Sequence, residues 1–400
     1  MAAPLAGITV IEVANYVAAP SVGGLMADLG ADVIKVEPPG GEVVRGIIPT
    51  DGPDGPAINY IFELENRGKR SVIVALDRPG GPELVHELVS RADIFLTNLL
   101  GSRLAKYRLT ADDIHAANPE AIFCSVSGYG SQGPGADRLA FDFAAFWARS
   151  GIMSVSGHPD GPPVLSRIAQ GDHTTGINAL AAIFAALRVR DQTGEGQSVD
   201  VTLQQTGVYT IATDISRALF DGKQPARMDR TAPPNPLFNT YQTSDGEWFL
   251  LVHMTPDPYW PKLCGAIERE DWADDETYST MRGRIPHGAE LAAGIQAAFA
   301  EHSMEYWAAR LDEFGLIWAP MATIPEVLQD ESLREIGAFE TIDHPLGPFE
   351  TVAVPFSIRD ADMKVRGPAP AAGEHTHEVL TELGISDERI ADLAADGVLG

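Results

Sequence analysis

The sequence predicts an α/β fold: a large domain on an open, Rossmann-like parallel sheet, with a smaller α+β domain inserted into it. Three observations predict this. Short segments rich in β-branched residues alternate with helical segments over the first third of the chain. A proline-rich stretch, 221–236, then reads as a linker. Beyond it, two apolar segments flank Ser244-Asp245-Gly246, which favours a hairpin because Asp-Gly supplies positive φ angles.

The large domain begins with the alternating pattern. Its strands are expected at 7–13, 32–37, 71–76, 93–97, 121–126 and 198–202. Its helices are expected at 20–29, 80–91, 111–117, from 172 to about 191, and 203–220. Parallel sheets bind ligands beyond the carboxyl ends of their strands. The loops expected at that edge are 14–20, 37–46, 98–106 and 127–134.

The small domain follows the linker. We expect strands at 238–243 and 247–253 and helices at 258–267, 288–300 and 304–314. The chain then returns through a helix at 324–328, strands at 339–342 and 351–354, and helices at 374–383 and 387–393. The expected divisions are a first part of the large domain at 1–200, a long helix and linker at 201–236, the small domain at 237–320, and a return linker with the rest of the large domain at 321–400.

The composition excludes several classes of function. A net charge of −27 argues against nucleic acid or an anionic membrane as partner. Cys124 and Cys264 are far apart and lack metal-ligand spacing, and the ten histidines are scattered, so no metal site is expected. The amino-terminal segment has no basic stretch before an apolar core, and no 18-residue apolar run occurs. We expect a soluble cytoplasmic protein with no permanently bound cofactor.

The first strand-to-helix loop is not a dinucleotide-binding loop. Its sequence, ANYVAAP, has none of the glycines that let a pyrophosphate approach the backbone, which disfavours an NAD-dependent dehydrogenase. A serine hydrolase is disfavoured too, because the GxSxG elbow is absent.

Two features remain as candidates for chemistry. Asp172 follows Gly171 at or just before the start of a long apolar helix, where it is either a helix cap or a functional carboxylate. Two clusters of basic residues flank strands of the same expected sheet. They are either ordinary solvated charges or a phosphate-binding rim, and they comprise Arg67, Lys69, Arg70, Arg103, Lys106 and Arg108.

Taken together, these segments resemble the class III CoA-transferase family, which also includes the α-methylacyl-CoA racemases. The resemblance covers nearly the whole chain. It rests on blocks in a fixed order: PLAGITVIEVANYVAAP, LMADLGADVIKVEPPGG, ENRGKRSV, ADIFLTN, SVSGYGSQGP, GDHTTG, TGEGQSVDV and GPAPAAGEHTHEVL. It implies an enzyme that moves CoA between an acyl-CoA and a carboxylic acid, and an interlocked homodimer.

The resemblance also implies roles for residues. Asp172 is the implied nucleophile, which carries CoA as an aspartyl thioester. The implied CoA contacts are Tyr16, Val17, Ala18, Pro38, Lys69, Arg70, Asn98, Arg103 and Lys106. Lys106 stands where relatives often have Arg, and the segment LLGSR at 99–103 departs from the family's usual loop. The detailed phosphate and adenine contacts there are therefore left open.

The acceptor pocket is expected around Asp142, Phe146, Trp147 and Arg149, with 235–241 as a lid. Arg149 is either a partner for a second carboxylate or a surface residue. The absence of a glycine run in 225–245 disfavours oxalate as acceptor.

Two alternatives stay open: an epimerase like the racemases and a non-catalytic acyl-CoA-binding protein. The racemases need a His, an Asp and a helping Glu. The His position falls on Phe141 and the Glu position on or near Thr255. Phenylalanine takes no proton, so the transferase is favoured over the epimerase.

Overall fold

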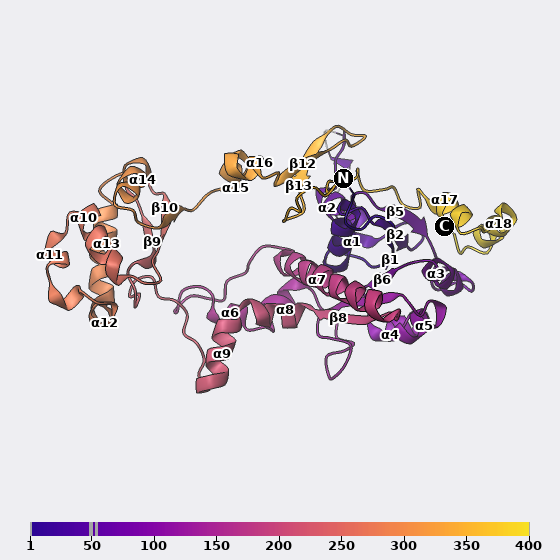
Figure 1. Ribbon diagram of the computed structural model, residues 1–400, viewed down its shortest axis with the longest axis horizontal. Coiled ribbons are helices and arrows are strands. Elements are labelled where there is room, and N and C mark those ends of the chain that lie inside the picture. The colour runs from indigo at the N-terminus through magenta and orange to yellow at the C-terminus, as the bar shows by residue number, and fades with distance from the viewer. Residues whose placement is uncertain (1, 48–50, 53–54, 400) are drawn as a thin grey trace. The chain divides into compact units, whose positions relative to one another are not determined.

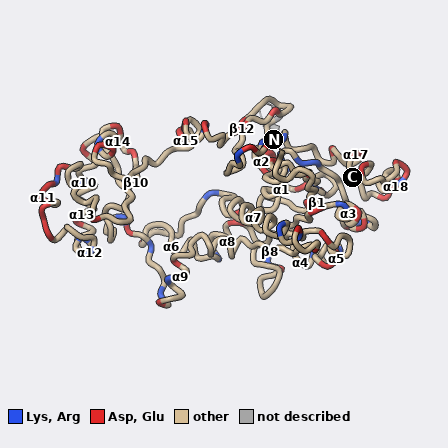
Figure 2. Tube along the Cα trace, viewed as in Figure 1, with Lys and Arg blue, Asp and Glu red and all other residues tan. Residues whose placement is uncertain are grey.

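The computed structural model describes residues 2–47, 51–52 and 55–399. Its contacts divide the chain into two compact units. The first, called the sheet unit, comprises Met1–Met153, Leu165–Lys223 and Ser332–Gly400. The second, called the small unit, comprises Ser154–Val164 and Gln224–Glu331. Acidic residues occur on elements of both units (Figure 2), so the negative charge does not mark one site.

Within the described residues, the sheet unit is built on a six-stranded sheet in which every neighbouring pair is parallel. The order is β5-β2-β1-β6-β7-β8. The strands are β1 (Thr9–Val13), β2 (Asp32–Glu37), β5 (Arg70–Ile73), β6 (Ile94–Thr97), β7 (Ile122–Ser127) and β8 (Ser198–Thr202). This confirms the expected parallel sheet. The strand order reverses between β1 and β6, which is where doubly wound folds bind their ligands.

Helices cover both faces of this sheet (Figure 1). On one face, α1 (Ala18–Asp28) and α7 (Gln170–Thr193) pack on Val10, Ile94 and Ile122. On the other, α3 (Gly81–Val89), α5 (Ala111–Ala117) and α17 (Thr376–Glu382) pack on Ile11 and Phe95. Because successive residues of a strand point to opposite faces, the strands are apolar on both sides, as in other buried parallel sheets.

The helix α7 lies directly against α1. A Cβ at Gly176 would overlap the Ser21 hydroxyl, so the two backbones approach at a distance that only glycine permits. This close packing fixes the start of α7 relative to the loop that precedes α1.

Two local expectations were wrong, and three short helical segments were not expected. The helix expected at 203–220 is broken at Ile211 into α8 (Leu203–Thr210) and α9 (Ala212–Asp221). The loop expected at 98–106 contains α4 (Gly101–Lys106). A π-helical turn, Phe143–Ala148, and the short helices α2 (Tyr60–Asn66) and α6 (Ile152–Val155) had no strong periodic signal, because segments of one or two turns depend on tertiary packing.

The small unit contains the expected hairpin, with β9 (Phe238–Gln242) antiparallel to β10 (Trp248–Val252) and β11 (Trp318–Pro320) added to its edge. Aromatic rings of Tyr241, Phe249 and Phe299 form the centre of its core. Its helices are α10 (Trp260–Ala266), α11 (Glu270–Ala273), α12 (Met281–Arg284), α13 (Gly288–Phe299), α14 (Met304–Glu313) and α15 (Ile324–Gln329).

The remaining elements are short. They are the strands β3 (Asp51–Gly52), β4 (Gly55–Pro56), β12 (Phe339–Ile342) and β13 (Phe349–Val352), the helices α16 (Glu331–Glu335) and α18 (Asp387–Ala395), and 3-10 turns at Val43–Gly46, Asp257–Tyr259, Glu276–Tyr278 and Ile285–His287. Among the helices of the described ranges, none is both long and apolar enough to cross a bilayer.

Candidate active site

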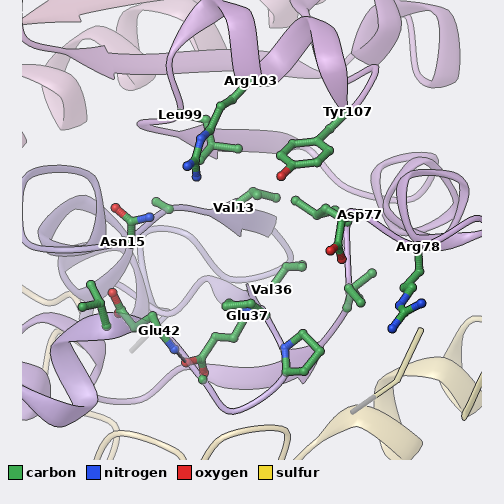
Figure 3. A pocket seen from close by; sticks show the side chains of 18 of the residues that line it. Val13, Asn15, Val36, Glu37, Glu42, Asp77, Arg78, Leu99, Arg103 and Tyr107 are labelled. Atoms are coloured by element: carbon green, nitrogen blue, oxygen red, sulfur yellow. Dashed lines mark hydrogen bonds between the residues drawn. The ribbon is translucent and has the colours of Figure 1, made fainter. Parts of the chain in front are cut away.

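A cavity of about 870 Å³ opens at the carboxyl ends of β1, β2, β5 and β6. Arg103 and Tyr107 reach it from one side, and Glu37 and Glu42 lie on the other (Figure 3). Leu99, which follows β6, lies beside Arg103, and Asn15, which follows β1, lies between the two sides. The cavity therefore occupies the point where the strand order reverses.

Two of the residues expected to contact CoA line this cavity, and others are neighbours of lining residues. Pro38 and Arg103 line it. Asn98 exchanges two hydrogen bonds with the backbone of Asn15, at 3.1 and 2.6 Å. Tyr16, Val17 and Ala18 follow Asn15 on the same loop. The ammonium of Lys106 lies over the ring of Tyr107, 5.0 Å from its centre.

Two expected contacts lie elsewhere. Lys69 is buried, and its Nζ is 2.7 Å from the Glu12 carboxylate. Arg70 begins β5, at the amino end of the sheet, and pairs with Asp32, Glu378 and Glu382. The side chains of both are thus occupied by acidic partners and do not line the cavity.

Asp172 lies in the first turn of α7, but it is not the cap. The helix begins at Gln170, and Ala169 takes the cap position with a positive φ of 66° and no side-chain capping hydrogen bond. Asp172 is therefore the third helical residue. A carboxylate there faces the positive end of the helix dipole without being consumed by capping. In the described part of the chain, no group donates a hydrogen bond to it.

Gly171 allows a second carboxylate to approach. Its amide donates a hydrogen bond of 3.2 Å to Asp142 Oδ2, and a Cβ at this position would overlap both Asp142 and the Phe146 ring. Asp142 is buried, and its Oδ1 has no hydrogen-bond partner among the described residues. The π-helical turn that begins at Phe143 thus presents Asp142 to the start of α7.

These surroundings change the ionisation of the acids. Burial, and secondly the charge of Asp142, raise the pKa of Asp172 to about 7. Burial also raises the pKa of Asp142, against the opposing effect of the Gly171 amide. Two neighbouring carboxyl groups with raised pKa values are typical of functional sites.

His173 moderates this repulsion. Its Nε2 lies 2.8 Å from the buried carboxylate of Glu65, and this hydrogen bond raises the pKa of the imidazole. The resulting positive charge beside Asp172 partly lowers the pKa of that carboxyl. No local pattern in the sequence indicates this pairing, because the partners are 108 positions apart.

The cavity and the carboxylates are joined by one ring contact. Tyr16 follows Asn15, and its ring meets that of Phe141 edge to face, with centroids 5.3 Å apart. Phe141 precedes Asp142. The residue at the racemase His position is thus an aromatic support for the loop.

The expected acceptor residues are only partly gathered. Trp147 packs edge to face on Phe146, and its indole nitrogen is buried with no hydrogen-bond partner among the described residues. Arg149 is exposed at the end of the π-helical turn, and Gln204 donates to its carbonyl. The expected lid, 235–241, belongs to the small unit.

Comparison with known proteins identifies relatives along the whole chain. The profile of CoA-transferase family III matches residues 5–376. The (R)-2-hydroxy-4-methylpentanoate CoA-transferase of Clostridioides difficile is 32% identical over 96% of this chain and 97% of its own. The succinate–glutarate CoA-transferase of Agrobacterium fabrum is 33% identical over 95% and 96%.

A solved structure agrees with these relatives. A CaiB/BaiF family protein from Brucella suis superposes with a TM-score of 0.83 at 33% identity, covering 96% of this chain and all of the other. The family profile, the relatives and the solved structure all indicate the same family. The chain belongs to the family III CoA-transferases.

Proposed function

We propose that the chain transfers CoA from an acyl-CoA donor to a carboxylic acid through an aspartyl-CoA thioester on Asp172. One observation carries the proposal. A carboxylate with a pKa near 7 lies in the first turn of α7, next to Gly171, whose missing side chain lets Asp142 approach the same turn closely. Near neutral pH it is substantially ionised, yet more basic than an ordinary aspartate and hence a better nucleophile.

The transfer consists of four acyl exchanges. The Asp172 carboxylate attacks the donor thioester carbon, the C–S bond breaks, and a mixed anhydride and CoA thiolate form. The thiolate attacks the aspartyl carbon of the anhydride and releases the donor acid as a carboxylate. The acceptor carboxylate then attacks the aspartyl thioester, forming a second anhydride and thiolate. The thiolate finally attacks the acceptor acyl carbon, giving the new acyl-CoA and free Asp172 carboxylate.

The first turn of α7 supports these steps electrostatically. The amino end of a helix has backbone N–H groups without intrahelical partners and a partial positive charge. Each exchange passes through a tetrahedral oxyanion next to Asp172, where such donors stabilise negative charge. Asp142 holds the Gly171 amide and so fixes the backbone at this point.

The cavity at the switch point is the proposed CoA site. Arg103 offers a guanidinium to a phosphate group, and Lys106 lies on the same helix. The loop that carries Asn15 and Tyr16 leads from the cavity toward Phe141. The thioester end of CoA is proposed to follow this loop to Asp172.

The acceptor is proposed to bind around Asp142, Trp147 and Arg149. Arg149 is exposed and would pair with the second carboxylate of a dicarboxylic acid. Replacing Arg149 with Met and screening mono- and dicarboxylic acids tests this role. Unchanged selectivity for dicarboxylates rules it out.

The two alternatives differ in what they require. An epimerase needs a second base at position 141, but the side chain of Phe141 cannot accept a proton. A non-catalytic binding protein does not need Asp172. Incubating the protein with acyl-CoA and a labelled acid separates the transferase from both alternatives, because only the transferase moves CoA onto the labelled acid.

Trapping the covalent intermediate tests the mechanism itself. Hydroxylamine or borohydride added during turnover should modify Asp172, as read by peptide mass spectrometry. Full transferase activity in Asp172→Ala would refute the proposal. The proposed assembly is an interlocked homodimer in the cytoplasm, and a monomer mass in light scattering would contradict the dimer.

A further inference from the structure

Four charged side chains are buried together beneath the carboxyl ends of β1 and β2. Glu12 and Lys35 are 0% exposed, Lys69 is 3% and Glu42 is 5%. They form a chain of ion pairs: Lys69 to Glu12 at 2.7 Å, Glu12 to Lys35 at 2.9 Å, and Lys35 to Glu42 at 2.9 Å. The two acids and two lysines, called here the buried quartet, balance each other in charge.

The quartet also contacts the loop between β1 and α1 and the first turn of α1. Lys35 Nζ donates to the carbonyl of Ala14 at 3.1 Å, and the amide of Tyr16 donates to Glu42 Oε2 at 3.0 Å. Lys69 Nζ donates to the carbonyl of Pro20, in the first turn of α1, at 2.9 Å and to Asn66 Oδ1 at 3.0 Å. Buried charges therefore hold the start and the middle of the loop and the helix turn that follows it.

The middle attachment is at a strained position. Tyr16 has a positive φ of 64°, which is unfavourable for a residue with a Cβ. Such a conformation persists only where the surroundings impose it. The hydrogen bond from its amide to the Glu42 carboxylate is a direct means of doing so.

The held loop joins the two parts of the site. Asn15 lines the cavity, and the Tyr16 ring supports Phe141, which precedes Asp142. Asp142 in turn accepts from the amide of Gly171, the residue before Asp172. A shift of Tyr16 would thus displace residues at both the proposed CoA site and the proposed nucleophile.

We propose that Glu42 is a positioning residue that keeps Tyr16 in the left-handed conformation and so sets the register between the CoA cavity and Asp172. The inference rests on the proposed function. Glu42 acts through its two oxygens, one on Lys35 and one on Tyr16. Glutamine at this position has only one carbonyl oxygen, so it can accept from Lys35 or from the Tyr16 amide but not from both.

A purely structural ion pair offers a matched control. Asp28 and Arg67 are as buried as the quartet and pair at 2.6 Å, yet their side chains make no contact with the β1–α1 loop in the described part of the chain. Asp28→Asn removes a buried charge of the same kind. It should lower stability without moving Tyr16.

The experiment compares Glu42→Gln with Asp28→Asn in the full-length protein. Melting temperatures and the kcat and KM for acyl-CoA are measured for both. We expect both variants to melt lower, but only Glu42→Gln to change kinetics, with kcat/KM reduced roughly 10- to 100-fold because small misplacements of reacting groups have effects of that size. Equal kinetic effects in the two variants would overturn the proposal.

A double-mutant cycle with Tyr16→Gly separates the positioning role from a general loss of stability. Tyr16→Gly accepts a positive φ without an anchor. Adding Glu42→Gln to it should reduce kcat/KM much less than adding it to the wild type, whereas an equal reduction contradicts the positioning role. Asp172→Ala is measured alongside. If it remains active, the proposed function fails; if it is inactive while Glu42→Gln behaves like Asp28→Asn, only the positioning role fails.

Discussion

Replacing Asp172 by Asn should stabilise the protein while abolishing transfer, and the stabilisation should depend on pH. The pKa of Asp172 is about 7 in the folded chain, against an ordinary value of 3.8. The folded state therefore binds this proton more tightly than the unfolded state. Stability contributed by the proton is lost as pH rises from about 4 to about 7, and the loss levels off above 7.

The size follows from the shift. A difference of about 3 pKa units corresponds to about 4 kcal/mol at pH 8, and roughly 2 kcal/mol is expected once partial solvent exposure and screening are allowed for. At pH 5 less than half of this penalty is in place, because the unfolded carboxyl is already ionised and the folded one is not. Asparagine carries no charge and avoids the penalty at both pH values.

Differential scanning fluorimetry at pH 5 and pH 8 measures this. At about 2 °C per kcal/mol for a protein of this size, Asp172→Asn should melt about 4 °C higher at pH 8 and less than half of that higher at pH 5. Asp191→Asn is the control, because Asp191 is an exposed residue near the other end of the same helix. A stabilisation that is absent, or equal at the two pH values, would refute the reasoning.

Three further predictions concern the same site. The rate of aspartyl-thioester formation in a single turnover should rise with pH through about 7. Asp142→Asn should move this rise to lower pH, because it removes a negative charge next to Asp172. Rapid-quench mass spectrometry measures both profiles, and an unchanged profile in Asp142→Asn would contradict the effect of Asp142 on the pKa of Asp172. Gly171→Ala should lower the free energy of unfolding by about 1–3 kcal/mol and reduce activity, because a Cβ there overlaps Asp142. Gly46→Ala is the control: its Cβ meets no atom within 4 Å, so chemical denaturation should show an unchanged free energy of unfolding. Arg103→Ala should raise the KM for acyl-CoA about tenfold with kcat little changed; an unchanged KM would remove Arg103 from the CoA site.

The sheet was predictable because its strands carry the signal within themselves. Segments such as 32–37 carry closely spaced β-branched residues, and the observed strand β2 has the same bounds. Helices α5 and α13 were equally clear from their periodicity. Helix 203–220 was wrong because its periodic pattern did not reveal the break at Ile211.

The edge of the sheet where the cavity lies was predictable, but the contacts of the side chains around it were not. The family's sequence blocks pointed to Asp172. The tendency of parallel sheets to bind ligands beyond the carboxyl ends of their strands pointed to the edge where the cavity lies. Burial of a charge leaves no local trace, so Lys69 read as a surface cation although it is part of the buried quartet. The same holds for Glu65 and Glu42, whose partners lie far away in sequence.

The buried quartet also limits how this sequence can change over time. Removing any one of its four charges leaves an uncompensated neighbour in the interior, which typically costs 3–5 kcal/mol, a large share of a domain's stability. Homologous chains should therefore lose or keep these charges in opposite-sign pairs. A lineage that exchanged Lys35 and Glu12 together for apolar residues would be free of the constraint, but it would need another way to hold the loop at Tyr16.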